Sequence, residues 1–186
     1  PSVHTSCSYK FLKKTMEEIK HKSRPIPPGH PFPGGDFLLA LTQEDCRVEE
    51  IVPFAPKAVI GLVNSGRGSP LPIGRHAARF SEGIVIDTLY RNSGTKANLV
   101  YWSKDFAEAL ISIASAENVA TIVTGNTPVG PIASILEEIR PILNKAGIQL
   151  YQIKRNYDEI CWPFTKSSFF SLKCKIPEIL SRLSLI

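Results

Sequence analysis

The chain has 186 residues, of which 43% are hydrophobic and 21% charged, so its length and composition suit one domain with a true core. Its net charge is +5 and its pI is about 9.1, which is compatible with an acidic partner such as nucleic acid but does not demand one. The sequence has no run of about 18 apolar residues, which excludes a membrane-spanning helix of that kind.

Four cysteines stand at positions 7, 46, 161 and 174, and no two of them form a Cys-x-x-Cys pair. Four histidines are equally scattered, so the sequence argues against a structural zinc site. Separated free thiols predict a reducing intracellular compartment, either the cytoplasm or the interior of an organelle. The sequence starts with Pro1 rather than Met, which is compatible with a processed N-terminus or a piece of a larger protein.

The N-terminal arm, residues 1–24, contains a predicted basic helix over residues 6–21. Its apolar stripe repeats at helical spacing and consists of Tyr9, Leu12, Met16 and Ile19. The opposite face carries five lysines, which indicates either a solvated face or a docking helix for a protein partner or an acidic surface. The Pro- and Gly-rich stretch 25–35 is interpreted as a linker, so the α/β domain is expected to span residues 36–186.

Five short β-branched or apolar runs predict strands, separated by helical patterns and polar turns. They cover residues 37–41, 57–63, 99–102, 119–124 and 148–153. The clearest helix lies between the last two strands, where Pro131 suits a first helical turn and Gly147 a left-handed helix stop. This alternation predicts an α/β fold with an open, mainly parallel five-stranded sheet and helices on both faces, in the Rossmann-like class.

Ligands of open parallel sheets bind at the carboxyl ends of the strands, so the loops at these ends are candidate sites. The loop after the fourth predicted strand offers Thr124, Asn126, Thr127 and Gly130 as cofactor-binding residues. Backbone N–H groups and small polar side chains of such a loop can approach a ligand closely, which is why we expect a function there.

The loop after the second predicted strand is the other candidate, with Asn64, Ser65, Gly66 and Arg67. Small residues let backbone N–H groups approach a phosphate, and Arg67 adds charge. The Gly-Lys-Ser/Thr of a P-loop and the spacing of a GxGxxG loop are both absent. The alternative is therefore a loop whose glycines only serve the turn.

The sequence contains no recognisable catalytic arrangement and no metal-binding motif, so we assign neither catalytic nor metal-ligating residues. Two acidic pairs, Glu44/Asp45 and Asp158/Glu159, lie just past predicted strand ends. They are placed to touch a ligand, but their spacing indicates no particular reaction.

The segment 160–183 is dense in aromatic and aliphatic side chains, among them Trp162, Phe164, Phe169 and Phe170. Ser167 or Ser168 is expected to start one last helix, bent at Pro177. Side chains at these spacings usually fill the edge of a core, and the alternatives are a ligand platform or a subunit contact.

Three phrases of the sequence are distinctive: Thr127-Pro-Val-Gly-Pro131, Trp162-Pro-Phe-Thr-Lys166 followed by Phe169-Phe170, and Ser69-Pro-Leu-Pro72. They resemble the α/β domain of the photolyase/cryptochrome family, in its bacterial branch of photolyase-related FAD-binding proteins. The resemblance extends over residues 37–183 and is better after residue 119.

The resemblance implies an α/β domain without the large helical domain that holds FAD in that family, for which this chain has no room. It also implies a cleft at the strand ends that holds a folate or deazaflavin antenna in many relatives. FAD would then lie on another chain or in a part that has been removed.

Four functions are compatible with these observations. The first is a photolyase-like module, non-catalytic by itself, that binds a nucleotide- or pterin-like ligand or another subunit. The second is the α/β part of a light-dependent DNA-repair flavoenzyme. The third is a structural subunit of a larger complex, held through helix 6–21 and segment 160–183. The fourth is a stand-alone nucleotide-binding enzyme that uses residues 64–69 on a phosphate.

Overall fold

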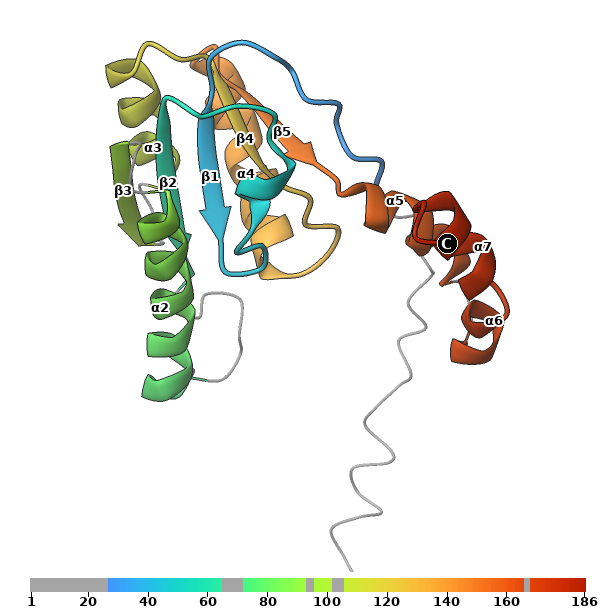
Figure 1. Ribbon diagram of the computed structural model, residues 1–186. Helices are drawn as coiled ribbons and strands as arrows, with labels where there is room; N and C mark the ends of the chain where they lie inside the picture. Colours follow the sequence, from blue (N-terminus) through green and yellow to red (C-terminus); the bar gives the residue numbers. More distant parts are fainter. Residues whose placement is uncertain (1–26, 65–71, 93–95, 102–105, 166–167) are drawn as a thin grey trace, which may run out of the picture.

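A computed structural model of the chain describes residues 27–64, 72–92, 96–101, 106–165 and 168–186 (Figure 1). The predicted helix 6–21 and the loop residues Ser65, Gly66 and Arg67 lie outside the described residues. Within them, no helix is both long and apolar enough to cross a membrane.

The strands form one five-stranded parallel sheet in the order β3-β2-β1-β4-β5 (Figure 1). Their bounds are Leu38–Thr42 for β1, Ala58–Val63 for β2, Lys96–Tyr101 for β3, Thr121–Gly125 for β4 and Gln149–Ile153 for β5. The predicted open parallel sheet is therefore confirmed. The third strand begins earlier than its apolar run indicated, because the polar residues Lys96 and Asn98 also pair with β2.

The central strand β1 is buried along its whole length. Leu38 and Ala40 belong to the apolar cluster on one face of the sheet, whereas Leu39 and Leu41 belong to the cluster on the other. Alternate side chains of a strand point to opposite faces, so a strand covered on both sides needs apolar residues at every position. This explains the continuous apolar run in the sequence.

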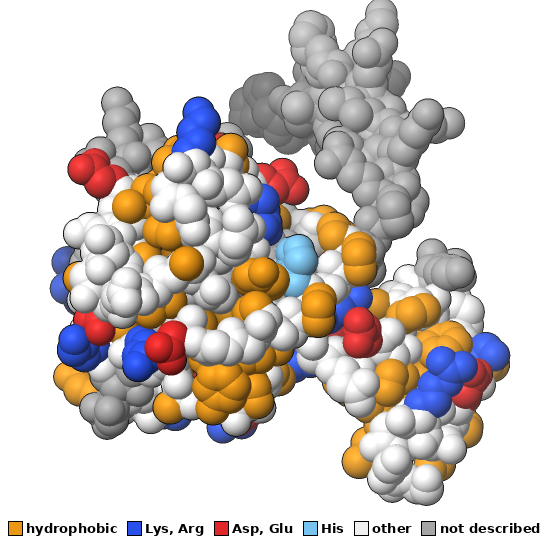
Figure 2. Space-filling view, turned by 90° about the horizontal axis from the view of Figure 1, so that it is seen from above, with side chains coloured by type: hydrophobic (Ala, Val, Ile, Leu, Met, Phe, Trp, Pro, Cys, Tyr) orange, Lys and Arg blue, Asp and Glu red, His pale blue; other side chains and the backbone are white. Residues whose placement is uncertain are grey.

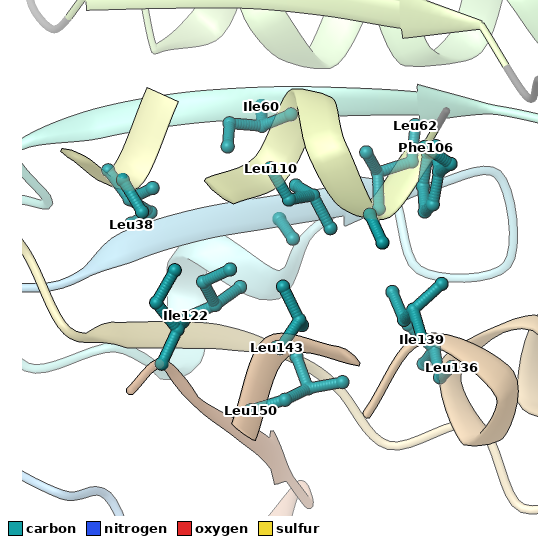
Figure 3. Close-up of a cluster of buried hydrophobic side chains, with 14 of the residues drawn as sticks. Leu38, Ile60, Leu62, Phe106, Leu110, Ile122, Leu136, Ile139, Leu143 and Leu150 are labelled. Atoms are coloured by element: carbon teal, nitrogen blue, oxygen red, sulfur yellow. The ribbon is translucent and has the colours of Figure 1, made fainter. Parts of the chain in front are cut away.

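Helices cover both faces of the sheet, as predicted. The first face is covered by α3 (Phe106–Ala116) and α4 (Pro131–Lys145), whose apolar side chains meet those of the strands (Figure 3). The second face is covered by α2 (Arg75–Arg91) and the short 3₁₀ helix η1 (Val48–Ile51). In the close-up, Leu110 of α3 and Leu143 of α4 point into one shared cluster (Figure 3).

The end of the predicted linker packs along the sheet. The backbone N–H of His30 donates to the Gln152 carbonyl at 2.8 Å, and the Gln152 N–H donates to His30 Nδ1 at 3.0 Å. Phe32 meets Phe37 and Phe54 edge to face, with ring centroids 5.2 Å apart in both pairs. These contacts hold the end of the predicted linker against the sheet. The division into arm, linker and domain stays a prediction.

After β5 the chain leaves the sheet as a series of short helices. They are α5 (Asn156–Cys161), the 3₁₀ helix η2 (Trp162–Phe164), α6 (Phe169–Lys173) and α7 (Ile176–Arg182). We call residues 156–186 the C-terminal arm, and Figure 1 shows it projecting beyond the β5 edge. The single bent helix predicted here is wrong: Ser168 caps a separate short helix, because its Oγ accepts the Ser171 N–H at 3.4 Å, and α7 starts afresh at Ile176.

The close approach of α2 to the sheet depends on Gly61. A Cβ at this position would lie 2.6 Å from Val85 Cγ1 and 2.9 Å from Leu89 Cδ1. We expect Gly61→Val to lower the free energy of unfolding by about 1–3 kcal/mol, measured by urea denaturation, because α2 must move outward. Gly83→Ala, in an exposed part of α2 with open space around it, is the control and should stabilise by about 0.5–1 kcal/mol. Equal stabilities of Gly61→Val and wild type would contradict this packing.

Candidate functional site

The strand order reverses between β1 and β4, because the chain continues from β1 to β2 on one side and reaches β4 on the other. The crevice at such a reversal is where open α/β sheets bind ligands. Buried polar residues gather there. Of the five in the described part of the chain, four lie at this carboxyl edge, namely Thr42, Asn64, Thr124 and Thr127.

The loop after β4 is tied to β5 by hydrogen bonds. The Asn126 N–H donates to the Ile153 carbonyl at 2.8 Å. The N–H and the Oγ1 of Thr127 both lie near Gln152 Oε1, at 3.3 and 3.4 Å. Among the described residues, Asn126 Nδ2 is buried without a hydrogen-bond acceptor. The Thr127 groups that were predicted to meet a ligand are thus engaged by the protein itself.

A carboxylate from the loop after β1 occupies the start of α4. Gly130, the N-cap residue, has φ 106°, and a Cβ built on it would lie 3.6 Å from Glu44 Oε1. Burial raises the pKa of the Glu44 carboxyl, and a hydrogen bond from the backbone N–H of Ile132 opposes this effect. Helix N-termini attract anions, and here Glu44 already fills that role. An anionic ligand would have to displace it.

The next residue, Asp45, joins this edge to the arm. Arg155 donates to its carboxylate through both terminal nitrogens, at 2.5 and 2.7 Å, and Asp45 Oδ1 also accepts the Arg47 N–H at 3.1 Å. This hydrogen bonding raises the pKa of Arg155. Asp45 packs so closely over Gly125 that no Cβ fits there. Since Arg155 is the N-cap residue of α5, the pair fixes where the arm begins.

The space left at the edge is small. The Asn64 N–H donates to Gln43 Oε1 at 3.2 Å, which closes the crevice on the β2 side. Beside it lies a cavity of about 10 Å³, lined by Thr42, Leu62, Val63, Asn64, Phe106, Ile132, Ile135 and Leu136. A cavity of this size has room for about one water molecule. In the described residues, the predicted crevice is therefore filled by side chains of the chain itself.

A larger hollow of about 320 Å³ lies elsewhere, bordered by η1, residues 52–56 and the end of α2. Its charged groups bind one another. Arg91 donates to Glu49 Oε1 at 3.2 Å and also reaches Asp87 and the Cys46 carbonyl. These contacts connect η1 to α2, which is a structural role. The described residues also contain no group of acidic, His and Cys side chains suited to a metal ion.

The C-terminal arm is the second candidate site. Phe169 and Phe170 of α6 are 65% and 75% exposed, whereas Cys161 and Ile179 are the only buried residues in the described part of the arm. Figure 2 shows the arm as a separate lobe where hydrophobic and basic side chains lie together. The expectation that the aromatic residues fill a core edge is wrong for Phe169 and Phe170, since α6 lies at the far end of the arm (Figure 1).

Two aromatic residues nearer the sheet are partly covered by cations. Lys154 Nζ lies 4.5 Å from the centroid of the Trp162 ring. Lys175 and Arg182 lie 5.8 and 5.4 Å from that of Phe164, and both also pair with Glu178, at 3.1 and 2.6 Å. Hydrogen bonding from Lys175 holds the pKa of Glu178 below its usual value. These contacts of the arm involve η2 and α7, and none of them includes Phe169 or Phe170.

Comparisons with known proteins show no family for this chain. No family model and no curated protein matches it. Among solved structures, it is similar to a protein from the universal stress protein family from Burkholderia pseudomallei, with 22% identity over 65% of this chain and 98% of that chain. The TM-score of 0.38 is too low to transfer any ligand, activity or partner.

The resemblance to the photolyase/cryptochrome family is therefore wrong. No family model or curated protein matches, and the solved structure named above comes from the universal stress protein family. The photolyase-like module, the light-dependent DNA-repair enzyme and the other functions inferred from the sequence have no support in these comparisons. The flavin and antenna chromophores rested on the resemblance alone. Of the matching phrases, Thr127–Pro131 lies in the loop before α4 and at its first residue, which unrelated α/β proteins need as well.

The charge of Glu44 gives a pH-dependent prediction. Burial raises the pKa of Glu44 in the folded state above the ordinary 4.5, so the folded chain favours the protonated carboxyl. The stability that this gives is present below pH 4.5 and is lost as pH rises through the folded pKa. We expect Glu44→Gln, which keeps an acceptor for the Ile132 N–H, to gain melting temperature over wild type between about pH 4 and about pH 7. Glu138→Gln, at an exposed position of α4, is the control. A gain that does not change with pH would refute this assignment.

The Asp45–Arg155 pair gives a second prediction. Removing one partner leaves a partly buried charge without its hydrogen bonds, so Asp45→Ala should cost about 1–3 kcal/mol in the free energy of unfolding. Asp36→Ala breaks the exposed pair with Lys57 and should cost less than about 1 kcal/mol. Amide hydrogen exchange in α5 should also rise in Asp45→Ala alone. Unchanged exchange would show that the pair does not position the arm.

Proposed function

We propose that this chain is a protein-docking module whose C-terminal arm binds a partner protein. The observation that carries the proposal is the pair of exposed phenylalanines on α6, at the end of the arm farthest from the sheet. Aromatic side chains of this size gain most when a partner encloses them, and they dominate the binding energy of many interfaces.

The arm cannot bury these side chains by itself. Its helices have six, five and seven residues, and isolated helices need roughly 12–15 residues to be stable in water. With only Cys161 and Ile179 buried among the arm residues that the structure describes, little apolar area offsets the entropy of ordering the arm. A partner surface that covers α6 would supply the missing burial.

The connection to the domain suits a docking role. The Asp45–Arg155 pair and the Lys154–Trp162 contact hold the start of the arm against the sheet. An arm with a fixed start loses less freedom when it binds, which favours affinity. The polar edge at the ends of β1 and β4 then serves to position the arm, which explains why its own side chains fill it.

The test is a photo-activated cross-linking amino acid placed at position 170, in cells and in the purified chain. We expect one discrete cross-linked protein species that disappears with Phe169→Ser. The matched control is position 90, because Tyr90 is 74% exposed on α2. Equal cross-linking at both positions would overturn the proposal. Binding of the arm to phospholipid vesicles, without a cross-linked protein partner, would also overturn it.

The double variant Phe169→Ser/Phe170→Ser separates docking from folding. Because both side chains are exposed, we expect its free energy of unfolding to stay within about 0.5 kcal/mol of wild type. Binding of the fluorescent dye anilinonaphthalenesulfonate, which reports exposed apolar surface, should fall in the same variant. A large loss of stability would show instead that α6 packs on the domain.

A further inference from the structure

The C-terminal arm carries unpaired charges of opposite sign at its two ends. Asp158 and Glu159 lie on α5, at the near end, and Lys173 lies on α6, at the far end. None of these three has an ion-pair partner among the described residues, whereas Lys175 and Arg182 are both engaged by Glu178. The unpaired charges of the described arm are therefore acidic on α5 and basic on α6, whereas Lys154 and Arg155, just before the arm, lie against Trp162 and Asp45.

Exposed aromatic side chains occur at both ends as well. Tyr157 on α5 is 60% exposed, and Phe169 and Phe170 on α6 are exposed to a similar degree. Each end thus combines an apolar surface with one sign of charge, and the two ends are complementary. In a two-fold interface each contact is made twice, so one end of the arm must fit the other end of the arm in the second copy.

We propose that the partner of the arm is a second copy of this chain, bound antiparallel about a two-fold axis. The inference rests on the docking function proposed above and names its partner. Phe169 and Phe170 of each copy lie against α5 of the other, and each Lys173 faces Glu159 of the other copy, since neighbouring residues of a helix point apart and Asp158 lies near Arg155. A parallel pairing is disfavoured, because it would set Lys173 against its own equivalent.

The expected dimer is weak, because two arms of this size bury less surface than a standard interface. We expect a dissociation constant on the order of 10–100 μM by analytical ultracentrifugation of the full chain. Phe169→Ser/Phe170→Ser should weaken the dimer at least about 100-fold, because the aromatic anchors are lost. Charge reversal by Lys173→Glu should weaken it about tenfold, since the change counts twice in a two-fold dimer.

The decisive measurement is a charge exchange. Glu159→Lys alone should weaken the dimer as Lys173→Glu does, and the two together should restore the dissociation constant to within about threefold of wild type. Asp158 is left unchanged in these variants because it also lies near Arg155. Lys145→Glu, at the exposed end of α4, is the control for the change in net charge and should have no effect.

Three results would overturn the inference. A dimer that persists in the aromatic double variant, or one that the charge exchange does not restore, excludes the antiparallel pairing of arms. A monomer at all concentrations whose dye fluorescence falls in the double variant excludes the second copy and leaves the proposed docking function standing. A monomer whose dye fluorescence does not change excludes both.

Discussion

Burial of β1 on both faces is the constraint on which the rest of the structure depends. A strand with no exposed side chain needs a helical layer on each side, which α3 and α4 supply on one face and α2 and η1 on the other. It also needs paired strands on both edges, which β2 and β4 provide. The reversal of strand order at β1 follows from this central position, and with it the place of the carboxyl edge where polar residues gather.

The same edge shows how polar groups can close a crevice as well as open one. Glu44 takes the position that an anion would occupy at the start of α4, and Gln43 accepts the backbone N–H that begins the loop after β2. Asp45 turns outward to Arg155. Buried polar groups are costly unless hydrogen-bonded, so the hydrogen bonds of Gln43 and Asp45 offset the cost of burying them at this edge. The edge thereby becomes the support for the arm.

The C-terminal arm differs from this edge, because its apolar side chains Phe169 and Phe170 are exposed and it has few internal contacts. Short helices that bury two side chains do not gain enough from packing to be held in isolation, so their contacts with charged neighbours matter more than usual. The function is assigned to the arm because most polar groups at the carboxyl edge are hydrogen-bonded, with Asn126 Nδ2 as an exception, whereas Phe169 and Phe170 of the arm are exposed.

The sequence by itself determined the fold class, because local patterns decide it. Continuous apolar runs predicted strands covered on both faces, and the stretch from Pro131 to Gly147 predicted α4 and its stop. The sequence also located the carboxyl-edge loops. The tertiary structure alone decided what fills them, since Gln152 lies 25 residues from its partner Thr127 and Arg155 lies 110 residues from its partner Asp45. Arg155, two residues after the end of the last predicted strand, was the available signal.

The sequence of the arm also could not show which of its aromatic side chains are buried. Aromatic residues in a row predict burial, but whether a domain has surface left to receive them depends on how the whole sheet is covered. Here both faces are already occupied by helices, so Phe169 and Phe170 remain outside. Local sequence specifies which side chains are apolar, and only the assembled fold specifies which of them find a place in the core.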